Sequence, residues 1–190
     1  ALDYNGKEGI ATAIGHAPIS AIIDPAAGSK NAIAESLTNI IWAPLQDNLD
    51  SVSLSANWMW PCKNEGEDAR LYKAVQAVSD FSIELGINVP TGKDSLSMKQ
   101  KYKDKEVISP GTVIISAAAN CNDILNIIEP VFQINDQNIY YINLANNNFN
   151  IGGSALSQTL EFVGSSTIDT CDPSYFKKTF NVFQNLILML

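Results

Sequence analysis

The sequence predicts an α/β domain in which helices cover one face of a mixed β-sheet. Segments with strand-like patterns alternate along the chain with segments of helical periodicity, which is the order expected of such a domain. With 46% apolar and 17% charged residues, the composition is that of an ordinary globular protein. A length of 190 residues is enough for one sizeable core, with one domain the default and two small ones possible.

Four elements are predicted in the first half of the chain. Residues 18–24 form an apolar run that favours a strand, and residues 29–41 have a helical pattern. Residues 51–58 alternate between polar and apolar side chains, as a half-buried strand does. A long amphipathic helix is predicted over residues 68–85, because its apolar side chains recur every three or four positions and Gly86 can end it.

The next elements are shorter. Residues 96–102 and 107–118 are predicted to form a β-hairpin that turns at residues 103–105. A short helix over residues 123–128 and a strand over residues 139–144 complete this part.

The last helix is predicted to begin at Asp172-Pro173, and its apolar side chains continue to the end of the chain. We interpret this helix as the first element of a second domain. The expected division is a domain over residues 1–165 followed by a linker and helix over residues 166–190, within a larger protein.

Charge and cysteine content exclude several classes of function. The net charge is −8 with only 12 Lys and Arg residues, so a broad basic surface for nucleic acid or for an anionic membrane is not expected. No apolar run is long enough to span a bilayer. Cys62, Cys121 and Cys171 lack Cys-x-x-Cys spacing and His16 is the single histidine, so no Cys/His metal site is expected. Reduced cysteines indicate a cytoplasmic protein.

Glu35 and Asn39 are candidate metal ligands. They stand four residues apart in a predicted helix and therefore lie on one face of it. Both carry oxygen ligands, which Mg²⁺ prefers, usually together with phosphate oxygens. The alternative is a solvated polar face, or a local capping role for Asn39.

A second candidate site is the segment Gly92-Lys93-Asp94-Ser95. Glycine lets a ligand approach the backbone closely, and the following residues supply a cation, a possible metal ligand and a hydroxyl. The segment is not a Walker loop, because the Gly-x-x-x-x-Gly-Lys-Ser/Thr pattern is absent. A charged β-turn is the alternative interpretation.

Six motifs in one order carry a family resemblance that covers residues 4–190. The sequence resembles the large single-chain form of phosphoribosylformylglycinamidine synthase, in the second of its two domains that are similar to the N-terminal domain of aminoimidazole ribonucleotide synthase. The motifs are DPAAGSKNAIAESLTN (24–39), LSANWMWP (54–61), GEDARLYKAVQAV (66–78), PTGKDSLSMK (90–99), SPGTVIISA (109–117) and IGGSAL (151–156).

The resemblance implies an ATP-dependent carbon–nitrogen ligase of purine biosynthesis with Mg²⁺ and ATP or ADP as cofactors. Such an enzyme converts formylglycinamide ribonucleotide, a phosphoribosyl substrate, to the amidine with ammonia from a glutaminase domain. No Gly-x-Cys-x-Gly nucleophile motif is present, so the glutaminase must lie elsewhere in the full protein. We expect this segment alone to be inactive and to form a homodimer through its exposed sheet face.

The resemblance also assigns roles to single residues. It implies that Glu35 and Asn39 bind Mg²⁺ at a nucleotide that can be structural rather than catalytic. Asn57 matches an asparagine at the rim of the family's cleft, where the cofactor binds.

Three further roles concern the second candidate site. Gly92 matches a position whose backbone lies against ATP, and Ser95 matches a substrate-contacting serine. Lys93, which is expected to bind the cofactor, replaces a metal-binding Asn of the short forms of the enzyme, and this leaves Asp94 as the substitute metal ligand. The resemblance identifies no catalytic residue within this chain.

Several alternatives remain open. The chain could belong to another ATP-dependent enzyme of the same superfamily, such as aminoimidazole ribonucleotide synthase, selenophosphate synthetase or thiamine-phosphate kinase. It could also be a non-catalytic scaffold whose nucleotide holds a pseudosymmetric assembly together. His16 is expected to be a surface residue. Gly152-Gly153-Ser154 either forms a backbone nest for phosphate or only permits a tight turn.

Overall fold

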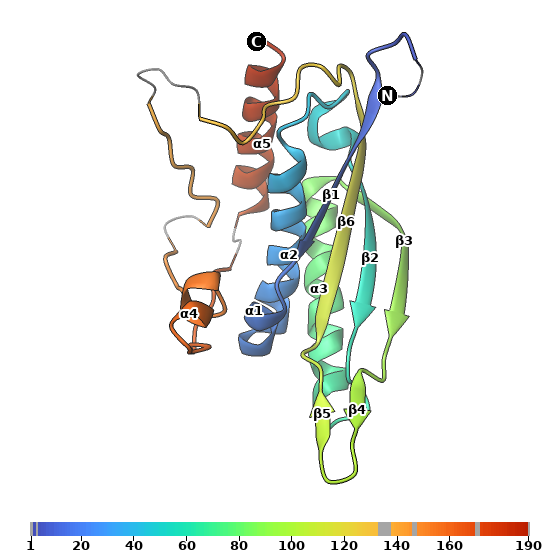
Figure 1. The fold of residues 1–190 in the computed structure, drawn as a ribbon, viewed down its shortest axis with the longest axis vertical. Coiled ribbons are helices and arrows are strands. Elements are labelled where there is room, and N and C mark those ends of the chain that lie inside the picture. Colours follow the sequence, from blue (N-terminus) through green and yellow to red (C-terminus); the bar gives the residue numbers. More distant parts are fainter. Residues whose placement is uncertain (1, 3, 133–137, 146–147, 170–171, 190) are drawn as a thin grey trace.

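The computed structural model describes residues 2, 4–132, 138–145, 148–169 and 172–189 (Figure 1). Its elements are, in chain order, β1 (Gly9–His16), α1 (Pro18–Ile23), α2 (Pro25–Ile40), the 3₁₀ turn η1 (Asn48–Ser51), β2 (Ser53–Met59), α3 (Glu67–Leu85), β3 (Asn88–Ser95), β4 (Lys99–Lys101), β5 (Glu106–Ile108), β6 (Thr112–Cys121), α4 (Ala155–Thr159) and α5 (Pro173–Ile187).

The main sheet has four strands in the order β1-β6-β2-β3. Strand β6 pairs antiparallel with both β1 and β2, and β2 pairs parallel with β3. Strands β1, β2 and β3 therefore run in the same direction, and their carboxyl ends lie at one end of the sheet. Helices α2 and α3 lie together on one face of this sheet (Figure 1), so the predicted fold class is confirmed.

The core lies between that sheet face and the helices. On β6 every second side chain points inward, so Val113 and Ile115 are buried while Ser116 is exposed. Helix α2 contributes Ile33 and Leu37, both fully buried. The opposite face of the sheet is open in the described part of the chain, where Ile10 and Ile14 of β1 are 58% and 60% exposed.

The predicted strand over residues 18–24 is wrong, because these residues form helix α1. A short apolar run has the same pattern in a buried strand and in a buried helical turn. Two helix-start signals decide here: Pro18 occupies the first turn of α1, and Asp24 caps α2 by accepting hydrogen bonds from the backbone N–H groups of Ala26 and Ala27. Helix α2 therefore starts four residues before the predicted helix.

The predicted helix over residues 123–128 is wrong. The Asp123 carboxylate accepts a hydrogen bond from the Leu125 N–H at 2.9 Å, which stabilises a turn in place of a helix. The predicted strand over residues 139–144 is also wrong, because the structure assigns no strand there. The Asn143 side chain accepts a hydrogen bond from the Ala145 N–H at 2.8 Å, which stabilises a local turn.

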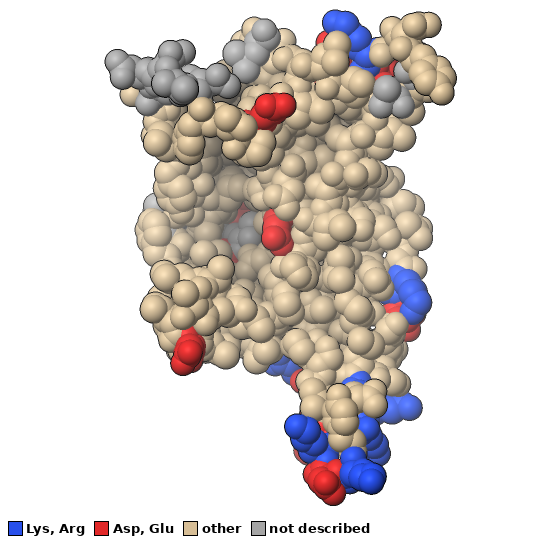
Figure 2. Space-filling view, viewed as in Figure 1, with Lys and Arg blue, Asp and Glu red and all other residues tan. Residues whose placement is uncertain are grey.

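The predicted hairpin forms, but its second strand is interrupted. Strands β4 and β5 pair antiparallel, and β6 begins only after residues 109–111. Gly111 lies so close to the Trp60 ring that a larger side chain would overlap with it. Lysine side chains gather on the hairpin, which extends beyond the body of the molecule (Figure 2). A hydrogen bond from Lys99 at 2.8 Å holds the pKa of Glu106 below its usual value.

Helix α5 begins after Asp172 as predicted, and its inner face joins the core. Phe176 is buried and packs edge-on against Phe81 of α3, with ring centroids 6.1 Å apart. Gln184 is fully buried and binds the chain between α2 and η1. Its Oε1 accepts the Leu45 N–H at 2.9 Å, and its Nε2 donates to the carbonyls of residues 41 and 43 at 2.5 and 3.0 Å. The division of the chain at residue 165 stays a prediction.

Among the described residues, the structure contains no helix with the length and apolar character needed to cross a membrane.

We expect Gln184→Leu to lower the free energy of unfolding by about 2–4 kcal/mol, because it leaves one N–H and two carbonyls of the chain buried without partners. Urea denaturation followed by circular dichroism measures this loss. Gln158→Leu is the matched control, since Gln158 is exposed and its change should alter stability by less than about 0.5 kcal/mol. Equal effects of the two substitutions would contradict the proposed role of Gln184.

Candidate functional site

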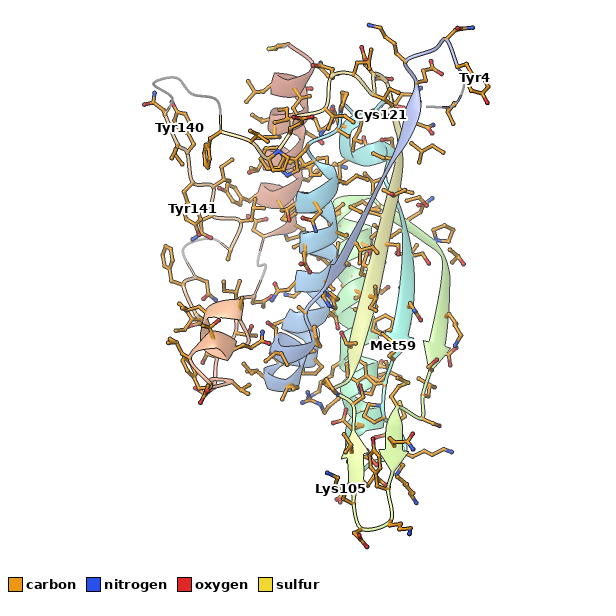
Figure 3. All side chains as sticks on the ribbon, viewed as in Figure 1. Tyr4, Met59, Lys105, Cys121, Tyr140 and Tyr141 are labelled. Carbon is orange, nitrogen blue, oxygen red and sulfur yellow. The ribbon has the colours of Figure 1, made fainter. Side chains whose placement is uncertain are left out.

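Polar side chains gather where β1, β2 and β3 end. The sheet face opposite the helices is called the outer face here. Strand register places four residues in one row across it, in the order His16, Ile114, Asn57 and Lys93. Neighbouring strands are about 4.8 Å apart, so Asn57 and Lys93 lie side by side. Met59, at the end of β2, marks this end of the sheet in Figure 3.

Glu35 and Asn39 lie on α2 beside the outer edge of β1. The carboxylate Oε2 of Glu35 accepts a hydrogen bond from the His16 N–H at 2.7 Å, and Nδ2 of Asn39 donates to the Ile14 carbonyl at 2.9 Å. Glu35 and Asn39 are four helical residues apart, which corresponds to a rise of about 6 Å. Their partners on β1, Ile14 and His16, are two strand residues apart, which is about 6.7 Å. Because the two spacings match, both hydrogen bonds can form together. The pair is therefore more than a solvated polar face, because each side chain has a backbone partner.

The pair keeps oxygen atoms for a cation. Within the described part of the chain, Oε1 of Glu35 and Oδ1 of Asn39 have no hydrogen-bond donor, and the Glu35 side chain is 47% exposed. The structure holds no group of three or more His, Cys, Asp or Glu residues suited to a metal, among the residues it describes. Two free oxygens therefore fit a Mg²⁺ ion whose other ligands are phosphate oxygens and water.

A pocket of about 470 Å³ opens beside Glu35. It is lined by His16, Glu35, Gly153 and their neighbours on α1, α2 and α4. Gly153 has φ +72°, and a Cβ there would lie 2.6 Å from the Ser20 backbone N, so the glycine permits a tight turn against α1. The Ser154 hydroxyl accepts the Ser157 N–H at 3.1 Å and caps α4. The turn interpretation of residues 152–154 is thus supported, and a phosphate nest stays a prediction.

The second candidate site lies on β3. The Lys93 ammonium group donates to the Ser95 hydroxyl and to the Asp94 carbonyl, both at 2.8 Å. Gly92 lies against the Ala56 carbonyl of β2, where a Cβ would clash. Lys93, Ser95 and the neighbouring Asn57 thus form one cluster on the outer sheet face, with an ammonium group, a hydroxyl and a carboxamide that can bind an anionic ligand.

Asp94 does not join either group of side chains. Because side chains alternate along a strand, it points to the opposite sheet face from Lys93. Two strands separate β3 from β1, so Asp94 lies at least about 14 Å from the edge that Glu35 contacts. The structure does not bring these two carboxylates together, and a metal-binding role for Asp94 stays a prediction.

Sequence reasoning missed the contribution of β1 to the site. The expectation for His16 was a surface residue, and its side chain is 56% exposed, yet its backbone N–H binds Glu35. Gly15 beside it lies against the backbone of α2. The available signal was Gly15, because a glycine inside a strand commonly marks a close backbone approach.

The described cysteines provide no reactive thiolate. Burial raises the pKa of the Cys62 thiol above its usual value, with further contributions from Asp68 and Glu67, and burial also raises the pKa of Cys121. Cys171 lies outside the described residues.

Comparison with known proteins identifies relatives that cover nearly the whole chain. A probable phosphoribosylformylglycinamidine synthase of Arabidopsis thaliana, chloroplastic/mitochondrial by its name, is 39% identical over 189 residues, which are 98% of this chain and 13% of the relative. The Caenorhabditis elegans and human synthases are 36% and 35% identical, each over 98% of this chain and 14% of the relative. The chain thus spans about one seventh of the length of these relatives.

Solved structures support the fold. Thermotoga maritima PurL complexed with AMPPCP matches 96% of this chain and 25% of its own chain, with a TM-score of 0.61 and 13% identity. A phosphoribosylformylglycinamidine synthase II of the same organism matches 68% of this chain and 20% of its own, with a TM-score of 0.52 and 16% identity. At such identities these similarities concern the fold alone.

A family model described as the FGAR-AT PurM_N-like domain matches residues 1–120. This match extends over most of the sheet and the helices that cover it, including Glu35, Asn39, Asn57 and the segment 92–95. The resemblance found in the sequence is confirmed, and the chain belongs to the FGAR-AT PurM_N-like domain family.

Proposed function

We propose that this chain is the nucleotide- and cation-binding part of a phosphoribosylformylglycinamidine synthase. The observation that carries the proposal is a match over nearly the whole of this chain. Three relatives bearing this enzyme name each align with 98% of it. Because the chain spans only 13–14% of these relatives, the activity of the complete enzyme and its partners are part of the proposal.

The proposed reaction makes an amidine from an amide. The γ-phosphoryl group of ATP is transferred to the amide carbonyl oxygen of the glycinamide unit of formylglycinamide ribonucleotide, which releases ADP and leaves the formyl group unchanged. Ammonia from a glutaminase domain elsewhere in the protein then adds to the activated carbon, and phosphate leaves. Phosphoryl transfer of this kind needs positioning and neutralisation of the phosphate charge more than it needs acid–base groups.

The polar groups at the end of the sheet support this chemistry. The free oxygens of Glu35 and Asn39 would hold Mg²⁺, which when bound supplies positive charge beside the phosphates. The Lys93 ammonium group would neutralise charge on the nucleotide, and the Ser95 hydroxyl beside it would bind the substrate. Asn57 would add a carboxamide, and the Gly92 backbone would lie against the nucleotide.

A structural nucleotide is the second candidate function, and one observation favours it. Glu35 and Asn39 already fasten α2 to β1, so a cation and nucleotide bound there would also stabilise the fold. In this version the site maintains the shape of the protein and the chemistry takes place elsewhere.

Self-association and location belong to the same proposal. The outer sheet face exposes Ile10 and Ile14, and we propose that an equivalent sheet covers it, in a homodimer of this chain or in the complete enzyme. Light scattering at micromolar concentration tests the homodimer, and a monomer would contradict it. We further propose a cytoplasmic location.

The substitution Glu35→Ala in the complete enzyme separates the two candidate functions. If the pair serves catalysis, we expect turnover to fall at least 100-fold while the melting temperature stays within a few degrees, since removing charge stabilisation at a phosphate typically has effects of this size. A lowered melting temperature with normal specific activity of the folded fraction would instead support a structural nucleotide. Glu84→Ala, at an exposed position of α3, is the control and should alter neither property.

The 190-residue chain alone should not catalyse the reaction. The Glu35–Asn39 pair provides only two oxygens for the cation, and the longer relatives have the sequence that could supply the rest of the site. Incubation with formylglycinamide ribonucleotide, ATP and ammonium chloride, followed by a phosphate-release assay, tests this expectation. Steady release of phosphate with formation of the amidine would contradict it.

A further inference from the structure

We propose that Gly15 and the outer edge of β1 position the Glu35–Asn39 pair, so that the strand edge sets the affinity of the pair for its cation. The inference rests on the proposed function, because it assumes that this pair binds a divalent cation. It assigns a positioning role to residues of β1 that need not touch the cation.

The first argument is that each side chain of the pair has one polar atom bound to β1 and another left for a cation. Oε2 of Glu35 is bound by the His16 N–H, and Nδ2 of Asn39 is bound to the Ile14 carbonyl. Oε1 of Glu35 and Oδ1 of Asn39 are free of donors within the described residues. Both side chains are therefore fixed in orientation by β1 before any cation arrives, which lowers the entropy lost on binding.

The second argument is the approach of β1 to α2. A Cβ on Gly15 would overlap with the Ala32 carbonyl and the Ser36 N–H group, and it would lie 3.0 Å from Cβ of Glu35. The atoms in the way are mainly helical backbone atoms, which cannot turn aside as a flexible side chain can. Only glycine allows the strand edge to come close enough for both hydrogen bonds to form.

The third argument is the identity of residue 39. The Ile14 carbonyl can only accept a hydrogen bond, and the Asn39 carboxamide donates one while keeping its own oxygen free. An aspartate would place a second acceptor against this carbonyl and would turn away from it. The strand edge thus favours Asn over Asp, although a cation alone would favour the added negative charge.

The first test measures Mn²⁺ binding with ADP present, by electron paramagnetic resonance, in the full natural length of the protein. We expect Gly15→Ala to weaken Mn²⁺ binding threefold or more. Gly28→Ala is the matched control. Gly28 lies on α2 like the pair but away from it, and a Cβ there would overlap with the Ala21 backbone of α1. Both substitutions should lower the melting temperature, but Gly28→Ala should change the Mn²⁺ affinity less than threefold. An affinity of Gly15→Ala within threefold of the wild type, or an equal loss in Gly28→Ala, overturns the inference.

The second test is Asn39→Asp, which tests whether β1 positions the pair even if Gly15→Ala does not fold. We expect weaker Mn²⁺ binding, by threefold or more, in spite of the added carboxylate. An affinity within threefold of the wild type, or a tighter one, overturns the inference, because charge would then outweigh the contact with Ile14.

The wild type and Glu35→Ala separate this inference from the proposed function. Mn²⁺ binding by the wild type that Glu35→Ala abolishes supports the cation site itself. A wild type that does not bind Mn²⁺ in the presence of ADP overturns the proposed site and this inference with it. Binding that is lost in Glu35→Ala but retained in Gly15→Ala and Asn39→Asp overturns the inference alone.

Discussion

The structure depends on the close packing of helix α2 against the elements around it. This helix contacts β1 and β6 on the sheet and both α1 and α3 beside it. Small residues make this possible: Gly28 lies against Ala21 of α1, and Gly15 of β1 lies against the carbonyl of Ala32. The backbones thus approach more closely than larger side chains allow, and dispersion forces act over the whole contact. The helix must be placed this closely before its polar face can reach a strand edge.

The contact between α2 and β1 also covers part of an unpaired sheet edge. The outer edge of β1 carries backbone groups without a strand partner, and such an edge can pair with other chains. Glu35 and Asn39 occupy part of this edge, and Glu35 also lines the pocket beside it. One pair of side chains thereby covers part of the sheet edge and forms the candidate site.

The sequence predicts the long elements well and the short ones poorly. Helices α2, α3 and α5 have clear periodicity or caps, whereas the pattern of residues 18–24 suits a strand and a helical turn equally well. Local hydrogen bonds, such as that of Asp123, determined the structure where propensity alone was misleading. At the site, the four-residue spacing correctly places Glu35 beside Asn39. It could not show which strand lies opposite, because that depends on the packing of the entire sheet.

The pairing of β1 with β6 affects how the protein forms during synthesis. Gly9 pairs with Cys121, so at 5–20 residues per second roughly 5–20 seconds pass between the synthesis of β1 and that of its sheet partner. Contacts between residues so distant in sequence close late in folding. The bonds from Glu35 and Asn39 join residues only 19 and 25 positions apart. Helix α2 therefore offers β1 a nearby partner while the ribosome is still making the rest of the sheet, and it can shield the new strand from aggregation.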